Sequence, residues 1–196
     1  MSKSMSSNMI ETAVMLPSIE NRRSPKRFLD IPVEPEKLRS ILDAARWAPS
    51  SRNEQPWRFI LATKENPDDF ERVLSALNEK NKEWASQAPL LLVAVAYQFV
   101  ERTGSPNKYA MHDVGSAVAN LTIQAVSLGL QVHQMGGFDS EKLRRLYQIP
   151  EGFDPVTVNA IGYEEEETFL QHERTRKELN SLVFEGEWGK PADIVQ

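Results

Sequence analysis

The sequence predicts an α+β fold: one domain over residues 8–196, preceded by a mobile polar tail over residues 1–7. The length of 196 residues suits a single compact domain. Helical and strand patterns alternate along the chain, but their connections are irregular, which argues against a doubly wound parallel sheet. The continuous apolar run over residues 90–97 is typical of a central strand that is buried on both faces.

In the first half of the chain, a helical pattern leads up to Ile19. A second helix begins near Glu36, where apolar residues recur at amphipathic spacing. It ends before Pro49, because the residue that precedes a proline disfavours helical angles. Residues 57–63 then form a strand, and residues 66–79 form a third helix.

The second half begins with the longest helical pattern, residues 109–130, which ends at Gly129, a typical C-terminal glycine. This helix is apolar nearly all round, so we expect it to be buried. Residues 130–135 form a short strand, and Asp139 caps a helix that stops before the next proline. Residues 156–163 form the last core strand.

Composition removes several classes of protein. The 28 acidic and 23 basic residues give a net charge of −5, which argues against a protein that coats nucleic acid. The absence of cysteine excludes disulfides, thiolate metal sites and cysteine nucleophiles. The three histidines lie on separate elements without the spacing of a metal site, and no dinucleotide-binding glycine fingerprint, P-loop or nucleophile elbow occurs. No stretch has the length of a signal peptide or a membrane span, so we expect a cytoplasmic protein with no membrane partner.

Three polar clusters and a glycine pair are the candidates for function. Arg22, Arg23, Ser24 and Lys26 form a set of donors that suits a phosphate, or else a solvated basic turn. Residues 48–57 hold hydroxyl and amide side chains that suit the edge of a heterocycle, or else an ordinary helix-to-strand loop.

The third cluster, residues 174–177, is either a phosphate clamp or an exposed helix start. Gly136 and Gly137 follow a strand, where a ligand can approach the backbone closely, although a tight turn explains them almost as well.

Taken in order, these pieces resemble the nitroreductase family of flavin enzymes. The string Asn21-Arg22-Arg23-Ser24-x-Lys26-x-Phe28 is followed by Ala48-Pro49-Ser50-Ser51-x-Asn53-x-Gln55-Pro56-Trp57. Later pieces are Ala88-Pro89, Asp113 and Asn120 in the long helix, Gly136-Gly137-Phe138-Asp139, and Arg174-x-Arg176-Lys177 before Trp188-Gly189. The resemblance covers residues 19–188, nearly the whole chain.

The resemblance implies a mostly antiparallel sheet flanked by helices, in an intertwined homodimer with FMN at the subunit interface. It assigns the phosphate and ribityl chain to Arg22 and Ser24, with Arg23 nearby and Arg174 and Arg176 closing on the phosphate. It places Lys26 near the pyrimidine edge of the ring and Asn81 at the ring edge. The partner subunit would contribute Pro49, Ser50, Ser51 and Asn53, with Gln55 close behind. Met135, Gly136 and Gly137 match the segment whose backbone amide points at flavin N5.

On this resemblance the chain is an FMN-dependent oxidoreductase. Hydride would pass from NADH or NADPH to flavin N5, and then to a nitroaromatic, quinone or similar small acceptor, in a ping-pong reaction that needs no side-chain acid or base. Some relatives carry a glutamate where this chain has Gly136, which leaves nicotinamide preference and acceptor size open. The short stretch over residues 98–107 suggests an open, permissive pocket.

Three other functions compete with this one. A specialised flavin enzyme of the same superfamily, such as a dehalogenase or dehydrogenase, would need dedicated lids that the sequence does not show. A non-catalytic FMN-binding dimer would store or sense the cofactor. A nucleic-acid binder would use the basic clusters, against the net charge of −5.

The sequence also supports a dimer independently of the resemblance. The helix over residues 109–130 is too apolar to face solvent, and the segment over residues 182–188 holds leucine, valine, phenylalanine and tryptophan. Both features fit burial against a second subunit.

Overall fold

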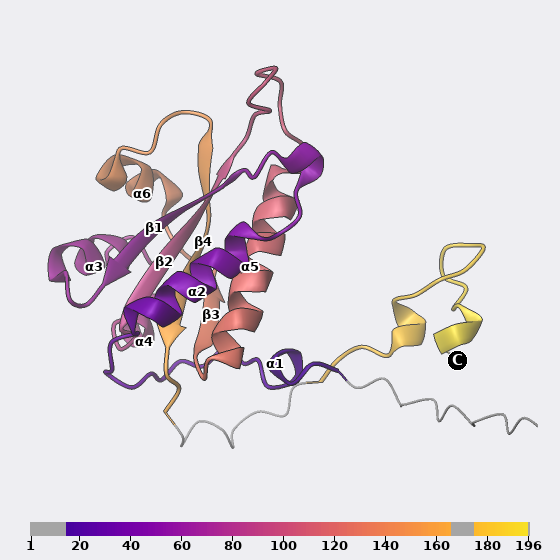
Figure 1. Ribbon diagram of the computed structural model, residues 1–196, viewed down its shortest axis with the longest axis horizontal. Helices are drawn as coiled ribbons and strands as arrows, with labels where there is room; N and C mark the ends of the chain where they lie inside the picture. The colour runs from indigo at the N-terminus through magenta and orange to yellow at the C-terminus, as the bar shows by residue number, and fades with distance from the viewer. Residues whose placement is uncertain (1–14, 166–174, 196) are drawn as a thin grey trace, which may run out of the picture. The chain divides into compact units, whose positions relative to one another are not determined.

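The computed structural model describes residues 15–165 and 175–195. The chain forms two compact units, residues 1–165 and 166–196, which are described separately below (Figure 1). The expected tail over residues 1–7 lies outside the described residues, and the expectation of one domain over residues 8–196 stays a prediction.

The first unit is built on a four-stranded antiparallel sheet. Its strands are β1 (Trp57–Thr63), β2 (Leu90–Tyr97), β3 (Gln131–Met135) and β4 (Phe153–Gly162), in the order β1-β2-β4-β3. All three pairings are antiparallel. The α+β class and the antiparallel sheet predicted from the sequence are therefore confirmed.

Helices cover both faces of this sheet. One face packs against α2 (Pro35–Arg46) and α5 (Ala110–Ser127), which also pack against each other. The other face packs against α3 (Pro67–Leu74), α4 (Glu79–Ala85) and α6 (Ser140–Tyr147). Short helices α1 (Pro17–Glu20) and η1 (Ser51–Asn53) lie near opposite ends of α5 (Figure 1).

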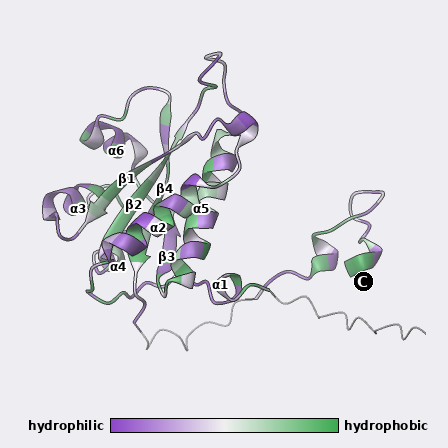
Figure 2. Ribbon diagram, viewed as in Figure 1, coloured by the Kyte–Doolittle hydropathy of each residue, from purple (hydrophilic) through white to green (hydrophobic). Residues whose placement is uncertain are grey.

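Strand β2 shows why the sheet occupies the middle layer. Its residues from Leu90 to Ala96 are all buried, and successive side chains alternate between the two cores. Leu90 and Leu92 pack against α2 and α5, whereas Leu91 and Val93 face the layer of α3, α4 and α6. Figure 2 shows this strand in hydrophobic green between helices with hydrophilic outer faces.

Most predicted elements agree with the structure to within a few residues. Strands β1 and β2 coincide with their predicted ranges, and β4 begins three residues before the predicted Val156. Asp139 caps α6, because its side chain accepts a hydrogen bond from the Lys142 amide.

The predicted helix over residues 66–79 is wrong. Helix α3 ends at Leu74, and a new helix, α4, begins after Asn78. The backbone amide of Asn78 donates to the Gly137 carbonyl, and Leu77 forms a bridge with Phe138. These bonds to a segment 60 residues away interrupt the helix at residues 75–78.

The second unit contains two short helices, η3 (Leu179–Ser181) and η4 (Asp193–Val195). Phe184 forms a bridge with Pro191, and its ring lies 5.1 Å from that of Trp188. Across both units, no helix in the described ranges is long and apolar enough to span a bilayer.

Candidate functional site

The basic loop, residues 22–26, lies between α1 and the first residues that bridge to the end of β4. Arg22 Nη1 donates to Ser24 Oγ at 3.2 Å. Ser24 and Lys26 are exposed, and Arg22 is half-buried. Two cations and a hydroxyl are thus held within one turn of the chain, which is the donor set that a phosphate requires.

Arg23 in the same loop is engaged differently. Its backbone amide donates to Gln131 Oε1 at 2.9 Å, and its Nε donates to Glu164 Oε2 at 3.0 Å. The Glu164 side chain is 4% exposed, so this is a largely buried carboxylate with a charged partner. The Arg23 guanidinium therefore fixes the basic loop to the end of the sheet.

His133 on β3 supports the loop from below. Its Nδ1 lies 2.8 Å from the Pro25 carbonyl, so this nitrogen carries the proton and donates. Its ring also packs on Trp84 of α4, with 4.3 Å between the ring centroids. Burial lowers the pKa of His133, and the nearby charges of Lys26 and Arg22 lower it further.

Helix α4 joins the basic loop to the glycine pair. Trp84 contacts His133, and one turn earlier Asn81 Nδ2 donates to the Gly137 carbonyl at 3.1 Å. Gly137 has no room for a side chain, because a Cβ there would lie 2.9 Å from Asn81 Nδ2 and closer still to Asn78 Nδ2.

Gly136 is the opposite case. It is exposed, and a Cβ added there would meet nothing within 4 Å, so its backbone is open to a ligand. The preceding Met135 is buried in the core, which leaves only its backbone for such a role. Because the resemblance assigns a cofactor to these residues, we call this region the cofactor half-site: the basic loop, Asn81 and residues 135–137.

The second predicted group forms a compact turn, which we call the serine turn (residues 49–55). The Gln55 amide donates to Ser50 Oγ at 3.0 Å, and Gln55 Nε2 donates to the Asn53 carbonyl at 3.2 Å. Arg52, Asn53 and Gln55 all have positive φ angles of 54°, 59° and 49°. Several non-glycine residues in the left-handed region within one turn are uncommon, and such strain concentrates at functional sites.

Asp113, in the first turn of α5, holds the serine turn in place. Its Oδ2 accepts the Ser51 amide at 2.9 Å, and its Oδ1 lies 3.0 Å from His112 Nδ1. The Asp113 side chain is 4% exposed. The resemblance included Asp113 in the family pattern, but the sequence analysis did not count it among the site residues. A charged residue on an otherwise apolar helix could have identified it as one.

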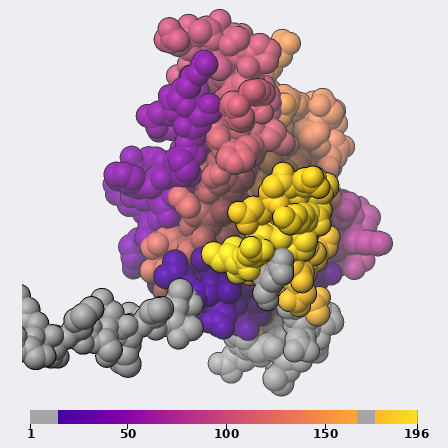
Figure 3. Space-filling model, turned by 90° about the vertical axis from the view of Figure 1, so that its right-hand side faces the viewer, coloured from indigo at the N-terminus to yellow at the C-terminus, as the bar shows by residue number. Residues whose placement is uncertain are grey.

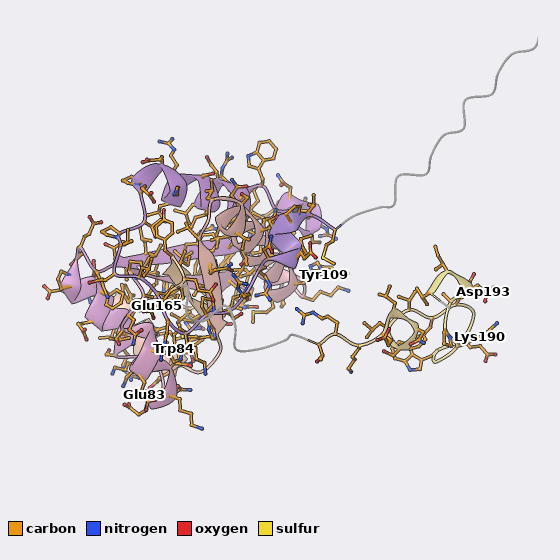
Figure 4. All side chains as sticks on the ribbon, turned by 90° about the horizontal axis from the view of Figure 1, so that it is seen from below. Glu83, Trp84, Tyr109, Glu165, Lys190 and Asp193 are labelled. Carbon is orange, nitrogen blue, oxygen red and sulfur yellow. The ribbon has the colours of Figure 1, made fainter. Side chains whose placement is uncertain are left out.

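The cofactor half-site and the serine turn lie at opposite ends of α5. The serine turn is bonded to its first turn through Asp113, whereas Arg23 is bonded to Gln131, four residues after its end. Eighteen helical residues span about 27 Å at 1.5 Å per residue. Trp84 and Tyr109, which neighbour the two regions, are well separated in Figure 4. The structure therefore does not bring all the predicted site residues together within one chain.

The remaining predicted residues lie in or before the second unit. Arg174 is outside the described residues. Arg176 is exposed, and its Nη1 donates to the Thr175 carbonyl at 2.9 Å. Several large apolar side chains of this unit are exposed, among them Leu179 at 61%, Trp188 at 93% and Ile194 at 91%. Within the second unit these side chains have no apolar cover.

Over residues 15–165 and 175–195, no three acidic or histidine side chains are grouped as ligands of a metal ion. The chemistry available at the two regions is therefore that of cations, hydroxyls, amides and exposed backbone.

Comparisons with known proteins identify one family. The family model described as "Nitroreductase family" matches residues 19–163. A protein of Methanothermobacter thermautotrophicus named "Putative NADH dehydrogenase/NAD(P)H nitroreductase" is 30% identical over 153 residues, which cover 76% of each chain.

Two solved structures are also similar. One, described as an oxidoreductase containing FMN, has a TM-score of 0.82 and 32% identity, and the match covers 95% of this chain and 98% of that one. A nitroreductase family protein from Clostridium difficile has a TM-score of 0.71 and 26% identity, with 87% of this chain and 96% of that chain covered.

Proposed function

The chain belongs to the nitroreductase family, and from this premise we propose that it is an FMN-dependent oxidoreductase that takes hydride from NADH or NADPH and reduces a nitroaromatic, a quinone or a similar small molecule. The observation that carries the proposal is the cofactor half-site, where two cations lie on the same edge of the sheet as an open glycine backbone. We expect the protein to act in the cytoplasm.

The residues of the cofactor half-site fit FMN. Arg22 and Ser24 would bind its phosphate and ribityl chain, with Arg174 and Arg176 contributing from the C-terminal side as the family pattern implies. Lys26 would lie at the pyrimidine edge, where a cation stabilises the negative charge of the reduced ring. The exposed backbone at Gly136 leaves room for the ring, and Asn81 holds the adjacent Gly137 in position. When bound, FMN supplies a ring that accepts hydride from the nicotinamide and returns two electrons to the acceptor.

The separation of the two regions supports a shared site in a homodimer. Within one chain the serine turn cannot reach the cofactor half-site, because α5 lies between them. A second copy that pairs antiparallel along α5 would bring its own serine turn, with Pro49, Ser50, Ser51 and Asn53, to that half-site. Two equivalent sites would result, as a two-fold axis requires.

A face of α5 is suited to such pairing. Met111, Gly115 and Ala119 follow one another at four-residue spacing and are exposed, and a Cβ on Gly115 would meet nothing within 4 Å. In the isolated chain, Gly115→Arg should therefore fold normally and gain helix propensity. In the dimer the arginine side chain should keep the two α5 helices apart, so we expect Gly115→Arg to be a monomer that binds FMN poorly. A Gly115→Arg dimer with full FMN content would contradict pairing through this face.

The first test is the visible spectrum of the purified protein, followed by anaerobic titration with NADH and with NADPH. We expect a flavin band that either donor bleaches and that a quinone or nitroaromatic restores. Arg22→Gln/Lys26→Gln should lower FMN affinity strongly, and Arg39→Gln/Arg145→Gln, which removes the same charge elsewhere, should leave it unchanged. A band that no donor bleaches would indicate an FMN-binding protein without this activity. A colourless protein that takes up no FMN would overturn the proposal.

A further inference from the structure

A hollow beside the serine turn is not used by the proposed function. It has a volume of about 220 Å³ and is lined on one side by the serine turn and on the other by the loop before α5. Figure 3 shows the two segments side by side at the top of the first unit, in purple and in pink. The Glu101 amide donates to Glu54 Oε2 at 3.0 Å and so joins the two loops. The polar and charged residues around the hollow include Ser51, Arg52, Glu54, Ser105, Asn107 and Lys108, and Tyr109 also lines it.

Asn107 in this lining has an unpartnered donor. The residue is 6% exposed, and its Oδ1 accepts the Tyr109 amide at 3.1 Å, which fixes the orientation of the side-chain amide. Its Nδ2 is buried and has no hydrogen-bond partner in the structure. Buried polar groups are nearly always paired, so this donor requires an acceptor, and the hollow that Asn107 lines is the space available for one.

The charges around the hollow show which acceptor it suits. Arg52 makes no hydrogen bond or ion pair with any other described residue, and Lys108 contacts only the face of the Tyr109 ring, 4.8 Å from its centroid. Helix α5 begins here without a side-chain cap, but the Asp113 carboxylate in its first turn offsets the positive end of the helix dipole. The carboxylate of Glu54, which accepts the Glu101 amide, contributes one negative charge, so the charged residues of the lining, Arg52, Lys108 and Glu54, keep one net positive charge. The hollow therefore favours an anion.

The hollow also adjoins the residues proposed to reach the cofactor. A neighbouring depression is lined by Pro49, Ser50, Ser51, Tyr109, His112 and Asp113, and it shares Ser51 and Tyr109 with the hollow. A molecule that reacts beside the serine turn can therefore extend an anionic group into the hollow.

We propose that this hollow binds the oxyanion group, phosphate or carboxylate, of a molecule that reacts at the shared site. The proposal rests on the proposed function for the identity of that molecule, but the anion site itself does not depend on it. Asn107 Nδ2 donates to the oxyanion, and Arg52 and Lys108 neutralise it. The group could belong to the nicotinamide donor, which carries phosphates, or to an acidic acceptor.

The anion site is tested first by calorimetry, which measures the equilibrium binding of inorganic phosphate to the purified protein. We expect Arg52→Asn/Lys108→Gln to weaken phosphate binding at least tenfold; asparagine tolerates the left-handed backbone at residue 52. Arg39→Gln/Arg145→Gln is the matched control, because it removes two exposed positive charges away from the hollow. Asn107→Leu should weaken binding as well. Phosphate binding that is equal in all variants would overturn the site, whether or not the protein carries FMN.

The source of the oxyanion is tested with pairs of reactants on the FMN-loaded protein. Bleaching is compared with NADH and with 1-benzyl-1,4-dihydronicotinamide, which has no phosphate; reoxidation is compared with 4-nitrobenzoate and nitrobenzene. If Arg52→Asn/Lys108→Gln slows bleaching by NADH tenfold but leaves bleaching by the benzyl compound unchanged, the site binds the donor. If it slows reoxidation by 4-nitrobenzoate but not by nitrobenzene, the site binds the acceptor. Equal rates for every pair, or a loss of FMN affinity alone, would overturn the assignment to a reactant. Absence of any bleaching in the wild type would instead contradict the proposed function and leave the phosphate result standing.

Discussion

Gly136 and Gly137 allow the packing of the cofactor half-site to be tested with two adjacent alanine substitutions. Gly137→Ala places a methyl group against Asn78 and Asn81, whereas Gly136→Ala places one in open space. Neither glycine has a positive φ angle, so backbone strain does not distinguish them. The two variants differ only in what the new methyl group meets.

The expected cost of Gly137→Ala follows from the bonds that must move. Asn78 Oδ1 accepts the Asn81 amide and so caps α4, and loss of such a cap costs about 1 kcal/mol. The bond from Asn81 Nδ2 to the Gly137 carbonyl contributes about 1 kcal/mol more. We therefore expect the free energy of unfolding to fall by about 2 kcal/mol, which for a chain of this size corresponds to a Tm lower by about 4–8 °C. Gly136→Ala should change it by less than about 0.5 kcal/mol.

The assay is thermal and urea unfolding of the FMN-free proteins at one protein concentration, followed by FMN titration. Gly136→Ala should unfold like the wild type but bind FMN about tenfold more weakly, because its methyl group occupies the space left for the ring. Equal Tm values for the two variants would refute the packing of α4 against Gly137. Unchanged FMN affinity in Gly136→Ala would refute the assignment of the ring to this backbone.

Three further predictions concern buried and titrating groups. Asp113→Asn replaces an acceptor with an NH₂ donor that faces the Ser51 amide or His112 Nδ1. In urea unfolding, it should lower the free energy of unfolding by about 1–3 kcal/mol. The matched control Asp43→Asn, at an exposed carboxylate, should have little effect. Hydrogen bonds from the Tyr163 hydroxyl, then from the backbone of Glu34 and from the Lys37 ammonium, lower the pKa of Glu34 from 4.5 to about 2. The stabilisation is therefore present above pH 4.5 and is lost as the pH falls toward 2. The urea midpoints of the wild type and Tyr163→Phe should differ near pH 6 and converge at low pH, and a constant difference would contradict this. Burial lowers the pKa of His133. Its neutral form therefore stabilises the fold above the ordinary pKa of 6.5, and this contribution falls as the pH drops below that value. In urea unfolding between pH 7 and 5, His133→Gln should remove this part of the pH dependence.

Where neighbouring residues determine an element, the sequence was sufficient to predict it. The apolar run of β2, the amphipathic spacing of α2 and the Asp139 cap of α6 are local signals, and each element lies where it was predicted. The break between α3 and α4 is not local. Phe70, Val73, Leu74 and Leu77 continue a helical spacing through it, and only the pairing of residues 77 and 78 with residues 137 and 138 ends the helix.

The candidate site shows the same division. The composition of the basic loop and the serine turn was readable, because donors and turn formers cluster in the sequence. The partners that hold them were not: Glu164 lies 141 residues after Arg23, His133 lies 108 residues after Pro25, and Asp113 lies 62 residues after Ser51. Each of these pairs exists only because the sheet and α5 bring distant segments together.

The position of the two regions on α5 has a consequence for how the site is built. Helix α5, of 18 residues, spans about 27 Å, with the serine turn bonded to its first turn and Gln131, which accepts the Arg23 amide, just after its end. Under the proposed pairing, one chain therefore contributes half of each of two sites. Antiparallel pairing about a two-fold axis joins each half to its complement with a single interface. The length of α5 would then set the separation of both sites at once; the buried Asp113 ties the serine turn to the first turn of α5, and the Arg23–Glu164 pair ties the basic loop to the end of β4. Substitutions that loosen either of these contacts should therefore act on FMN affinity through the partner's site as well as through stability.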